Sequence, residues 1–391
     1  MSFDRRQLAV AAAGFCAFLD LYPTQSLLPA LAAEFHAGKA AVGLTVSATT
    51  LAVALTAPLS GLLAGRLGRK RVIVAGACLM AIPTLMAATA GGIGELVLWR
   101  FLQGLFLPSV FAVAAAHIGE EWPPAEAADL TGIHVAGMVV GGFSGRFITA
   151  MVGEAVGWRY GFPVLAAINL AGALLIALWL PPDSDRGDRL TAPLGALAQV
   201  ARHLRNGRLL ATCGIGFLIL FSMVSVFTYI NFKLAAPPFN LGLSALGMIF
   251  VVYLFGMPAA PATGPLLRRF GRRRVMAGAV LANCLGLALT LSGNLWGVVA
   301  GLVLFAGGIF VAQPLAIGFA GVCAKEAKAL AIGMYVSCYY IGGSLGGVVP
   351  ATVWEHFGWP GCAALVALVQ VLLLAATFTA WAPAAPRPCV A

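Results

Sequence analysis

Residues 61–71 read GLLAGRLGRKR, and the pattern recurs 203 positions later as GPLLRRFGRRR at 264–274. Each copy follows one long apolar segment and precedes another. A second pair of segments, 141–158 and 342–359, shares the residues GG, G, E and GW in the same order, each displaced by 201. Such constant displacements indicate an internal repeat of about half the chain. The sequence therefore predicts two similar halves packed together.

The composition places these halves in a membrane. Of 391 residues, 61% are hydrophobic and only 10% are charged, too few to cover a soluble domain of this size. Segments near the ~20 apolar residues that cross a bilayer recur along the chain, so we predict an all-α polytopic membrane protein with twelve transmembrane helices. The predicted spans are 8–31, 42–64, 72–91, 95–117, 129–153, 161–180, 209–231, 243–263, 275–293, 295–320, 328–353 and 360–381.

The basic residues predict the orientation. With a cytoplasmic N-terminus, 19 of the 24 lysines and arginines fall in inside segments, and only Lys39, Arg159 and Lys233 fall outside. Both termini are therefore expected in the cytoplasm, with the protein in the cell inner membrane. Arg5 and Arg6 before an apolar run resemble a secretory signal, but the run is long and contains Asp20, so we interpret it as the first span.

The longest polar interval divides the chain into a first bundle at 1–180, a cytoplasmic linker at 181–208 and a second bundle at 209–391. Within the linker, Thr191 is the expected cap of a helix that begins at Pro193. Apolar residues share one face of this helix and arginines the other, which predicts that it lies on the inner leaflet beside anionic lipids. A solvated linker is the alternative.

The repeated loop, together with RFLQG at 100–104, resembles the signature of the major facilitator superfamily, and the resemblance covers essentially the whole chain. Leu19-Asp20 and Pro29 are similar to a pattern of its drug:proton antiporter branches. The glycine-rich stretches 141–146 and 339–347 resemble the bacterial YnfM-type efflux proteins. The sequence departs from the antiporter pattern in the fifth span, where Gly141-Gly142 stands in place of a Gly-Pro pair.

The resemblance implies a major facilitator fold of two parallel-repeat six-helix bundles that rock about a central site. Spans 1, 4, 7 and 10 would line the cavity, and spans 2, 5, 8 and 11 would join the halves. The glycines of spans 5 and 11 provide faces on which helix backbones approach closely. Sliding at these faces and static packing are both consistent with the sequence.

The two basic loops are the expected cytoplasmic gate. The family loop carries an aspartate before its first arginine, but Gly65 and Arg268 occupy these positions here, so neither loop has its usual carboxylate. We expect the loop arginines to contact inner helix ends and anionic lipid. The predicted gate residues are Gly61, Arg66, Gly68, Arg69, Gly264, Arg269, Gly271 and Arg272.

Charges inside the first half suggest proton coupling. Asp20 lies ~18 Å from the inner end of its span, and Arg100 and Arg146 lie at ~22 and ~26 Å, assuming 1.5 Å per residue and a ~30 Å core. Charged groups at such depths are costly unless paired or hydrated. We predict that Asp20 is the protonatable group and that Arg100 or Arg146 stabilises its ionised form. A fixed structural pair is the alternative, and Pro23 is expected to kink the helix beside the carboxylate.

The other polar groups on cavity-type helices are few. A sugar transporter would need more amides, so the cavity suits a lipophilic or amphipathic solute, whereas two arginines against one aspartate leave room for an organic anion. The predicted cavity residues are Tyr22, Thr24, Gln25, Gln103, Ser222, Ser225, Tyr229, Asn231 and Gln313.

The favoured function is secondary active transport, with proton-coupled efflux of a small solute. Proton-coupled uptake of an organic anion or another metabolite is the alternative, and a non-transporting receptor or scaffold is a distant one. No phosphate loop, HExxH motif or nucleophile with its base supports an enzyme. The eight cysteines have no metal-ligand spacing, and we interpret His117 and His134 as interfacial. We therefore expect a monomer without metal, cofactor or nucleic-acid partner.

Overall fold

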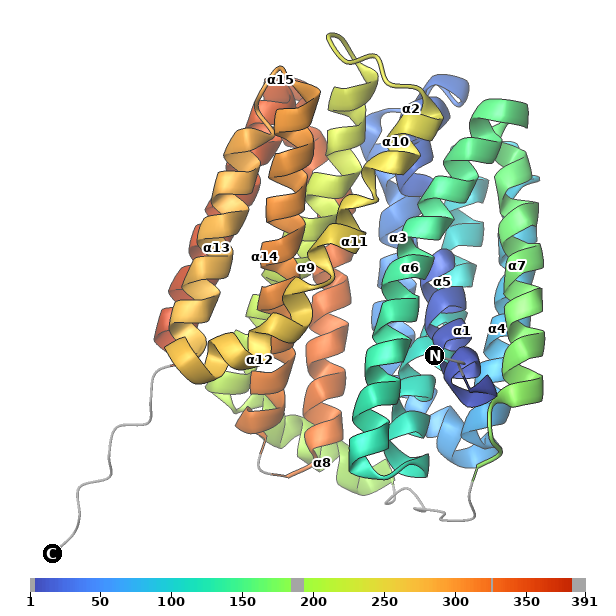
Figure 1. The fold of residues 1–391 in the computed structure, drawn as a ribbon, viewed down its shortest axis with the longest axis vertical. Coiled ribbons are helices and arrows are strands. Elements are labelled where there is room, and N and C mark those ends of the chain that lie inside the picture. The colour runs from blue at the N-terminus through green and yellow to red at the C-terminus, as the bar shows by residue number, and fades with distance from the viewer. Residues whose placement is uncertain (1–3, 184–192, 325, 382–391) are drawn as a thin grey trace, which may run out of the picture.

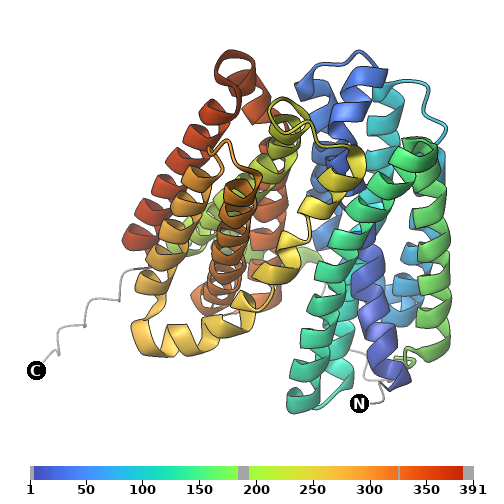
Figure 2. The same cartoon turned by 45° about the horizontal axis from the view of Figure 1, so that its top comes forward.

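The computed structural model describes residues 4–183, 193–324 and 326–381, and these ranges form helices joined by short turns. Two bundles lie side by side, the first blue to green and the second yellow to red (Figure 1; Figure 2). Within the described ranges, nine helices are long and apolar enough to cross a membrane, or ten if a bent pair in the second half forms one span. The all-α prediction is confirmed.

The first half contains the first six predicted spans. The first span comprises three short pieces, and each of the other five is one helix. In order these are α1 (Arg5–Leu19), the 3-10 helix η1 (Pro23–Leu27), α2 (Leu28–Glu34), α3 (Lys39–Leu67), α4 (Arg69–Ala87), α5 (Ile93–Glu121), α6 (Pro124–Val156) and α7 (Trp158–Trp179).

The second half repeats the plan after the helix α8 (Pro193–Leu204), which begins at the proline predicted to start it; Thr191 lies outside the described residues. The remaining helices are α9 (Gly207–Ala235), α10 (Leu243–Ile249), α11 (Val252–Gly256), α12 (Ala259–Phe270), α13 (Arg272–Leu289), α14 (Leu295–Cys323) and α15 (Lys328–Ala380). Gly358, at φ 58° and ψ −150°, divides α15 into the last two predicted spans.

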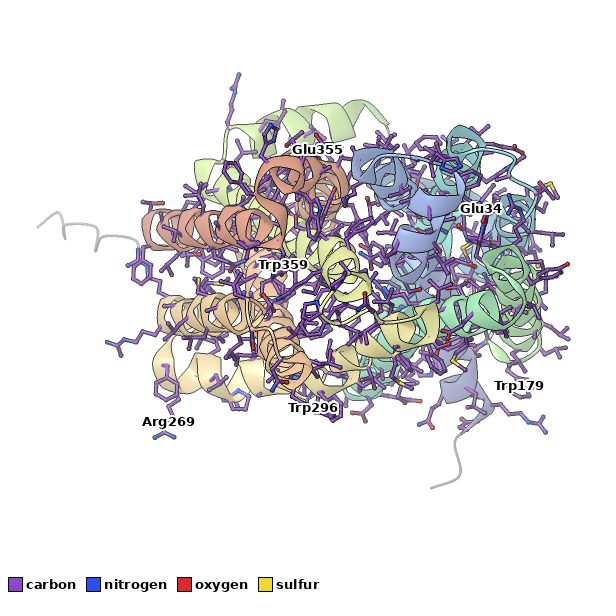
Figure 3. The ribbon with its side chains drawn as sticks, turned by 90° about the horizontal axis from the view of Figure 1, so that it is seen from above. Glu34, Trp179, Arg269, Trp296, Glu355 and Trp359 are labelled. Atoms are coloured by element: carbon purple, nitrogen blue, oxygen red, sulfur yellow. The ribbon has the colours of Figure 1, made fainter. Side chains whose placement is uncertain are left out.

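The ends of the bundle are named here after α2, at the top of Figure 1, and α8, at the bottom. The basic loops lie at the α8 end, which is the end predicted to be cytoplasmic. Seen from the α2 end, the halves lie next to each other, with Glu34 on the first and Glu355 on the second (Figure 3). Trp296 projects at the outer rim and is 78% exposed, as expected for a side chain at a membrane surface (Figure 3).

Two spans are broken. The first is interrupted at Asp20–Tyr22, just before Pro23, where the predicted kink appears as a gap between α1 and η1. The eighth predicted span is divided into α10, α11 and α12, and its two parts meet at 47°. The span pattern did not predict this second break. Interrupted helices in membrane proteins are characteristic of places where backbone groups face a cavity or polar side chains.

The repeated glycines bring backbones together within each half. A Cβ atom added to Gly141 or Gly145 of α6 would overlap the carbonyl oxygens of Phe15 and Leu19 in α1. In the second half, Gly342 and Gly346 of α15 meet α9 in the same way. Close approach at these glycines, predicted from the sequence, is therefore confirmed.

The contacts between the halves gather near the α2 end. The large interfaces join α3 to α15 and α6 to α10, as the resemblance implied for spans 2, 5, 8 and 11. Ser47 Oγ donates to the Ser344 carbonyl at 2.5 Å, and the Ser244 amide donates to Glu154 at 2.5 Å. In the described residues, the hydrogen bonds that directly join the two bundles all lie in the middle or in the α2-side part of the molecule. This conformation is thus closed toward the α2 end.

Candidate transport site

The break in the first span places Asp20 at the centre of the first half. Its side chain is completely buried, and neither carboxylate oxygen has a hydrogen-bond partner among the described residues. Arg100, Thr84 and Gln103 are its polar neighbours. The structure therefore places Asp20 beside Arg100, one of the two arginines that the sequence analysis offered as its partner.

Arg100 also compensates for the broken helix. Its guanidinium donates to the carbonyl oxygen of Asp20 at 2.8 Å and to that of Leu21 at 2.7 Å, and its Nε donates to the Thr45 carbonyl at 3.3 Å. Carbonyls released by an interrupted helix must find donors because lipid offers none. The planar fork of arginine suits this role. Arg100 is therefore held by the backbone of two neighbouring helices, in contact with Asp20 through its main chain.

Arg146 lies elsewhere, between the two halves. Its Nε donates to Gln25 Oε1 at 2.8 Å, and Gln25 in turn donates to Thr228 of α9 at 3.1 Å. The guanidinium carbon lies 4.8 Å from the ring centre of Tyr22, 4.7 Å from Phe250 and 5.1 Å from Tyr253. Such cation–π contacts stabilise a buried cation. Among the described residues, Arg146 has no ion pair with a carboxylate.

The remaining predicted cavity residues have mixed surroundings. Ser225 and Tyr229 donate to backbone carbonyls of α15, at 3.2 and 2.9 Å. Ser222 accepts from Gln370, and Asn231 donates to its own helix. Among these predicted cavity residues, the buried polar groups without a hydrogen-bond partner in the described structure are the hydroxyls of Tyr22 and Thr24 and Oδ1 of Asn231. These three groups are accordingly the better candidates for contact with a solute or water. Gln313 is half-buried.

An aromatic group near the junction completes this central region. Phe111 of α5 lies 6.1 Å from Tyr340 of α15, measured between ring centres, and Tyr339 packs edge-on against Tyr340 at 5.4 Å. These residues could not be predicted as cavity residues from the sequence, because aromatic side chains are common throughout apolar spans and the prediction relied on polar side chains. Phe111 and Tyr340 thus form an aromatic contact between the two halves.

Two of the loop arginines contact the ends of neighbouring helices. Arg69, which begins α4, forms an ion pair with Glu120 at the end of α5. In the second half, the Arg272 guanidinium lies 4.4 Å from the Phe319 ring near the end of α14. Each contact lies within its own bundle, and neither joins the two halves. The turns pass through Gly68 and Gly271 at φ 88° and 76°, a conformation that favours glycine.

A carboxylate does reach the first loop, although the loop itself lacks one. Asp183, just after α7, accepts a hydrogen bond from the Lys70 amide at 3.3 Å, and its carboxylate lies against Gly68. It thereby occupies the start of α4, where a negative charge is favourable. The interpretation that the gate lacks a carboxylate holds for the loop sequence but not for the folded loop. Sequence reasoning missed Asp183 because it lies 113 residues from Lys70.

Two helical bundles related by sequence repeat, spanning a membrane and joined around a buried polar centre, define a membrane transporter. The chain belongs to the Major Facilitator Superfamily, whose family model matches residues 10–258 and 228–389. The inner membrane transport protein YnfM of Escherichia coli (strain K12) is 32% identical over 372 residues, which cover 95% of this chain and 89% of YnfM.

Solved structures show the same fold at lower identity. The crystal structure of the nucleoside transporter NupG superposes with a TM-score of 0.76 at 18% identity, covering 97% of this chain and 99% of NupG. The human organic anion transporter MFSD10 gives a TM-score of 0.72 at 17% identity, covering 95% of this chain and 98% of that protein. Membership of this family makes the chain a multi-pass secondary transporter that works by alternating access, and not an enzyme.

Proposed function

We propose that this transporter exports a small lipophilic or amphipathic solute in exchange for protons. Asp20 carries the proton, and Arg100 is the positive charge that stabilises its ionised form. One observation carries the proposal: a fully buried carboxylate, without a hydrogen-bond partner in the described structure, stands at a broken helix beside a buried arginine. Intramembrane acids of this kind commonly mark proton pathways.

Burial explains how the proton would follow conformation. An ionised carboxylate in a dry site is costly unless a positive charge or water is close. When the cavity opens, water reaches the site and the ionised form becomes less costly. When it closes, the carboxylate is either stabilised by the nearby charge of Arg100 or takes up a proton. Exchange with a solute follows if the solute and the proton favour opposite states of the site.

The surroundings of the site indicate the class of solute. Tyr22, Phe111, Tyr340 and Tyr253 provide aromatic surfaces, while the unpartnered hydroxyls are few. An apolar pocket with a small number of polar groups suits a lipophilic or amphipathic molecule. The predicted cavity residues include few of the amide side chains that would bind the hydroxyl groups of a sugar.

Arg146 favours a second candidate, proton-coupled uptake of an organic anion. Its charge is buried between the halves and has no carboxylate partner within the described ranges. The surrounding rings stabilise a cation, and an anionic solute would add the missing opposite charge. This candidate shares the proton site with the first and differs in the charge and direction of the solute.

Flux in proteoliposomes tests the proposal. Counterflow with cationic, neutral and anionic compounds first identifies a solute, and an imposed proton gradient then drives its accumulation. For one-to-one exchange, a gradient of one pH unit supports accumulation of up to about tenfold. Asp20→Asn should abolish this accumulation but preserve counterflow, because exchange needs the rocking motion and not proton release.

The matched control is Asp129→Asn, which neutralises an exposed carboxylate in α6. It should accumulate solute as the unmodified protein does. Full accumulation by Asp20→Asn would show that Asp20 is structural and that the coupling site is wrong. Selective loss of anion counterflow in Arg146→Gln would support the organic-anion candidate over the first.

A further inference from the structure

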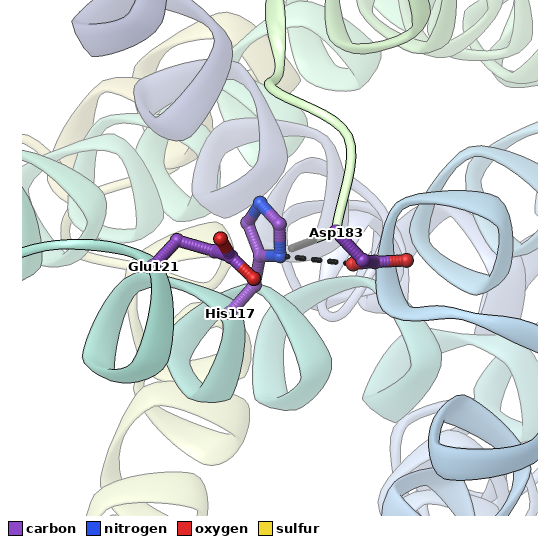
Figure 4. A group of neighbouring side chains, drawn as sticks. All are labelled: His117, Glu121 and Asp183. Atoms are coloured by element: carbon purple, nitrogen blue, oxygen red, sulfur yellow. Dashed lines mark ion pairs between the residues drawn. The ribbon is translucent and has the colours of Figure 1, made fainter. Parts of the chain in front are cut away.

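A histidine and two carboxylates meet at the α8 end of the first half (Figure 4). His117 and Glu121 are one turn apart at the end of α5, and Asp183 approaches them from the segment after α7. One ligand atom from each residue lies within 4.8 Å of the other two. His117 Nδ1 lies 3.3 Å from Asp183 Oδ1. Three potential metal donors from two separate segments therefore converge.

The interpretation of His117 and His134 as interfacial is wrong, because both side chains are buried, and the ring nitrogens of His134 contact the carbonyls of Val10 and Phe111. The His117 side chain is completely buried, and neither ring nitrogen has a hydrogen bond of good geometry in the described ranges. The ring packs edge-on against Trp122 at 5.6 Å, and its Nδ1 faces the Asp183 carboxylate (Figure 4). Nδ1 has only the 3.3 Å contact with Asp183, and Nε2 has no partner in the described ranges. A buried polar group that lacks a good hydrogen bond is costly, and a bound cation would satisfy it.

We propose that His117, Glu121 and Asp183 bind one transition-metal cation of the Zn²⁺ class. Zinc bonds of about 2.0–2.1 Å in tetrahedral geometry place neighbouring ligand atoms about 3.3 Å apart. The His117–Asp183 separation of 3.3 Å has this value. A small side-chain rotation brings Glu121 into the third position, and water completes the coordination. An imidazole among the donors favours zinc, cobalt or nickel over magnesium or calcium.

The local charge also suits a cation. Two carboxylates face the site, and the end of α5 contributes the negative pole of its helix dipole. The neighbouring Arg69 is already paired with Glu120, which reduces its repulsion of a bound ion. Asp183 also accepts from the Lys70 amide. A bound ion thus links the end of α5, the segment after α7 and the turn before α4.

Metal titration of the untagged, full-length protein in detergent tests this site. A chromophoric chelator in competition for Zn²⁺ reports its affinity and stoichiometry. We expect one site per chain, weakened at least tenfold by His117→Ala, by Asp183→Asn and by Glu121→Gln. Unchanged affinity in all three variants would overturn the proposal.

Two further measurements separate this site from other sources of binding. His356→Ala removes an exposed histidine at the opposite end of the bundle and should leave the affinity unchanged. Co²⁺ should give a ligand-field spectrum without thiolate charge transfer, because no cysteine belongs to the site; a thiolate band would assign the binding to cysteines instead. Zn²⁺ should also raise the melting temperature of the unmodified protein and not that of Glu121→Gln. If Zn²⁺ raised the melting temperatures of the unmodified protein and of Glu121→Gln equally, the proposed site would be wrong, and this test does not depend on the folding of His117→Ala.

Discussion

Ser47→Ala should weaken the closure of the α2 end. The Ser47 hydroxyl of α3 donates to the Ser344 carbonyl of α15 at 2.5 Å, and it is one of the few hydrogen bonds that cross between the halves. Hydrogen bonds between membrane helices contribute about 0.6 kcal/mol on average and at most about 1.7. Since 1.4 kcal/mol is a factor of ten, the closed population relative to the open one should fall about threefold, and at most about eighteenfold.

Distances between spin labels on the two halves measure this equilibrium. Labels at His36 and Ala236, introduced as cysteines in a cysteine-free chain, occupy exposed positions near the α2 end. Double electron–electron resonance should show a larger population of long label-to-label distances in Ser47→Ala than in the unmodified protein. Ser60→Ala is the matched control, because Ser60 donates only to Ala57 of its own helix in the described structure. Equal shifts in the two variants, or none in Ser47→Ala, would refute the role assigned to the hydrogen bond.

Three other substitutions test the packing and the loops. Gly145→Ala should cost about 1–3 kcal/mol because its Cβ would overlap the Leu19 carbonyl, whereas Gly132→Ala, which has open space, should leave the melting temperature nearly unchanged. Arg100→Lys should lower the melting temperature and the flux because lysine lacks the planar fork of donors that reaches the Asp20, Leu21 and Thr45 carbonyls together, and a normal melting temperature would contradict this. Arg69→Gln should change the free energy of unfolding by less than about 1 kcal/mol, because the ion pair with Glu120 is partly exposed. It should nevertheless alter the initial transport rate. A normal transport rate would mean that the loop arginines serve only to orient the protein in the membrane.

The sequence predicted the large features of the fold because they depend on periodic patterns. The duplication, the helical spans and the glycine faces follow from spacing and apolar length, and the structure contains all of them. The break at Pro23 could also be predicted from the sequence, because proline lacks the amide hydrogen that a helix needs. The break in the eighth span was not, since it depends on how α10 and α11 pack against α6 and α14.

The site was predicted in part. Depth along a helix suggested that Asp20, Arg100 and Arg146 lie at one level, but depth does not give the direction of a side chain. Arg100 lies beside Asp20, whereas Arg146 points between the halves toward Tyr22 and Phe250. The contact of Asp183 with the α3–α4 turn was not predicted because Asp183 reaches this turn from a segment that is distant in the sequence. The orientation of the termini and the division into two domains remain predictions from charge and repeat.

The hydrogen bonds of Arg100 limit which groups can move during the proposed proton cycle. If this arginine left its place, the carbonyls of Asp20 and Leu21 in the first span would lose its hydrogen bonds in a water-poor interior. Arg100 therefore acts as an anchored charge, and the proposed cycle must change the distance or the hydration around Asp20 instead. The same guanidinium joins α5 to the break in the first span and to α3, so one residue supplies both the positive charge near Asp20 and a hydrogen-bonded link between three helices.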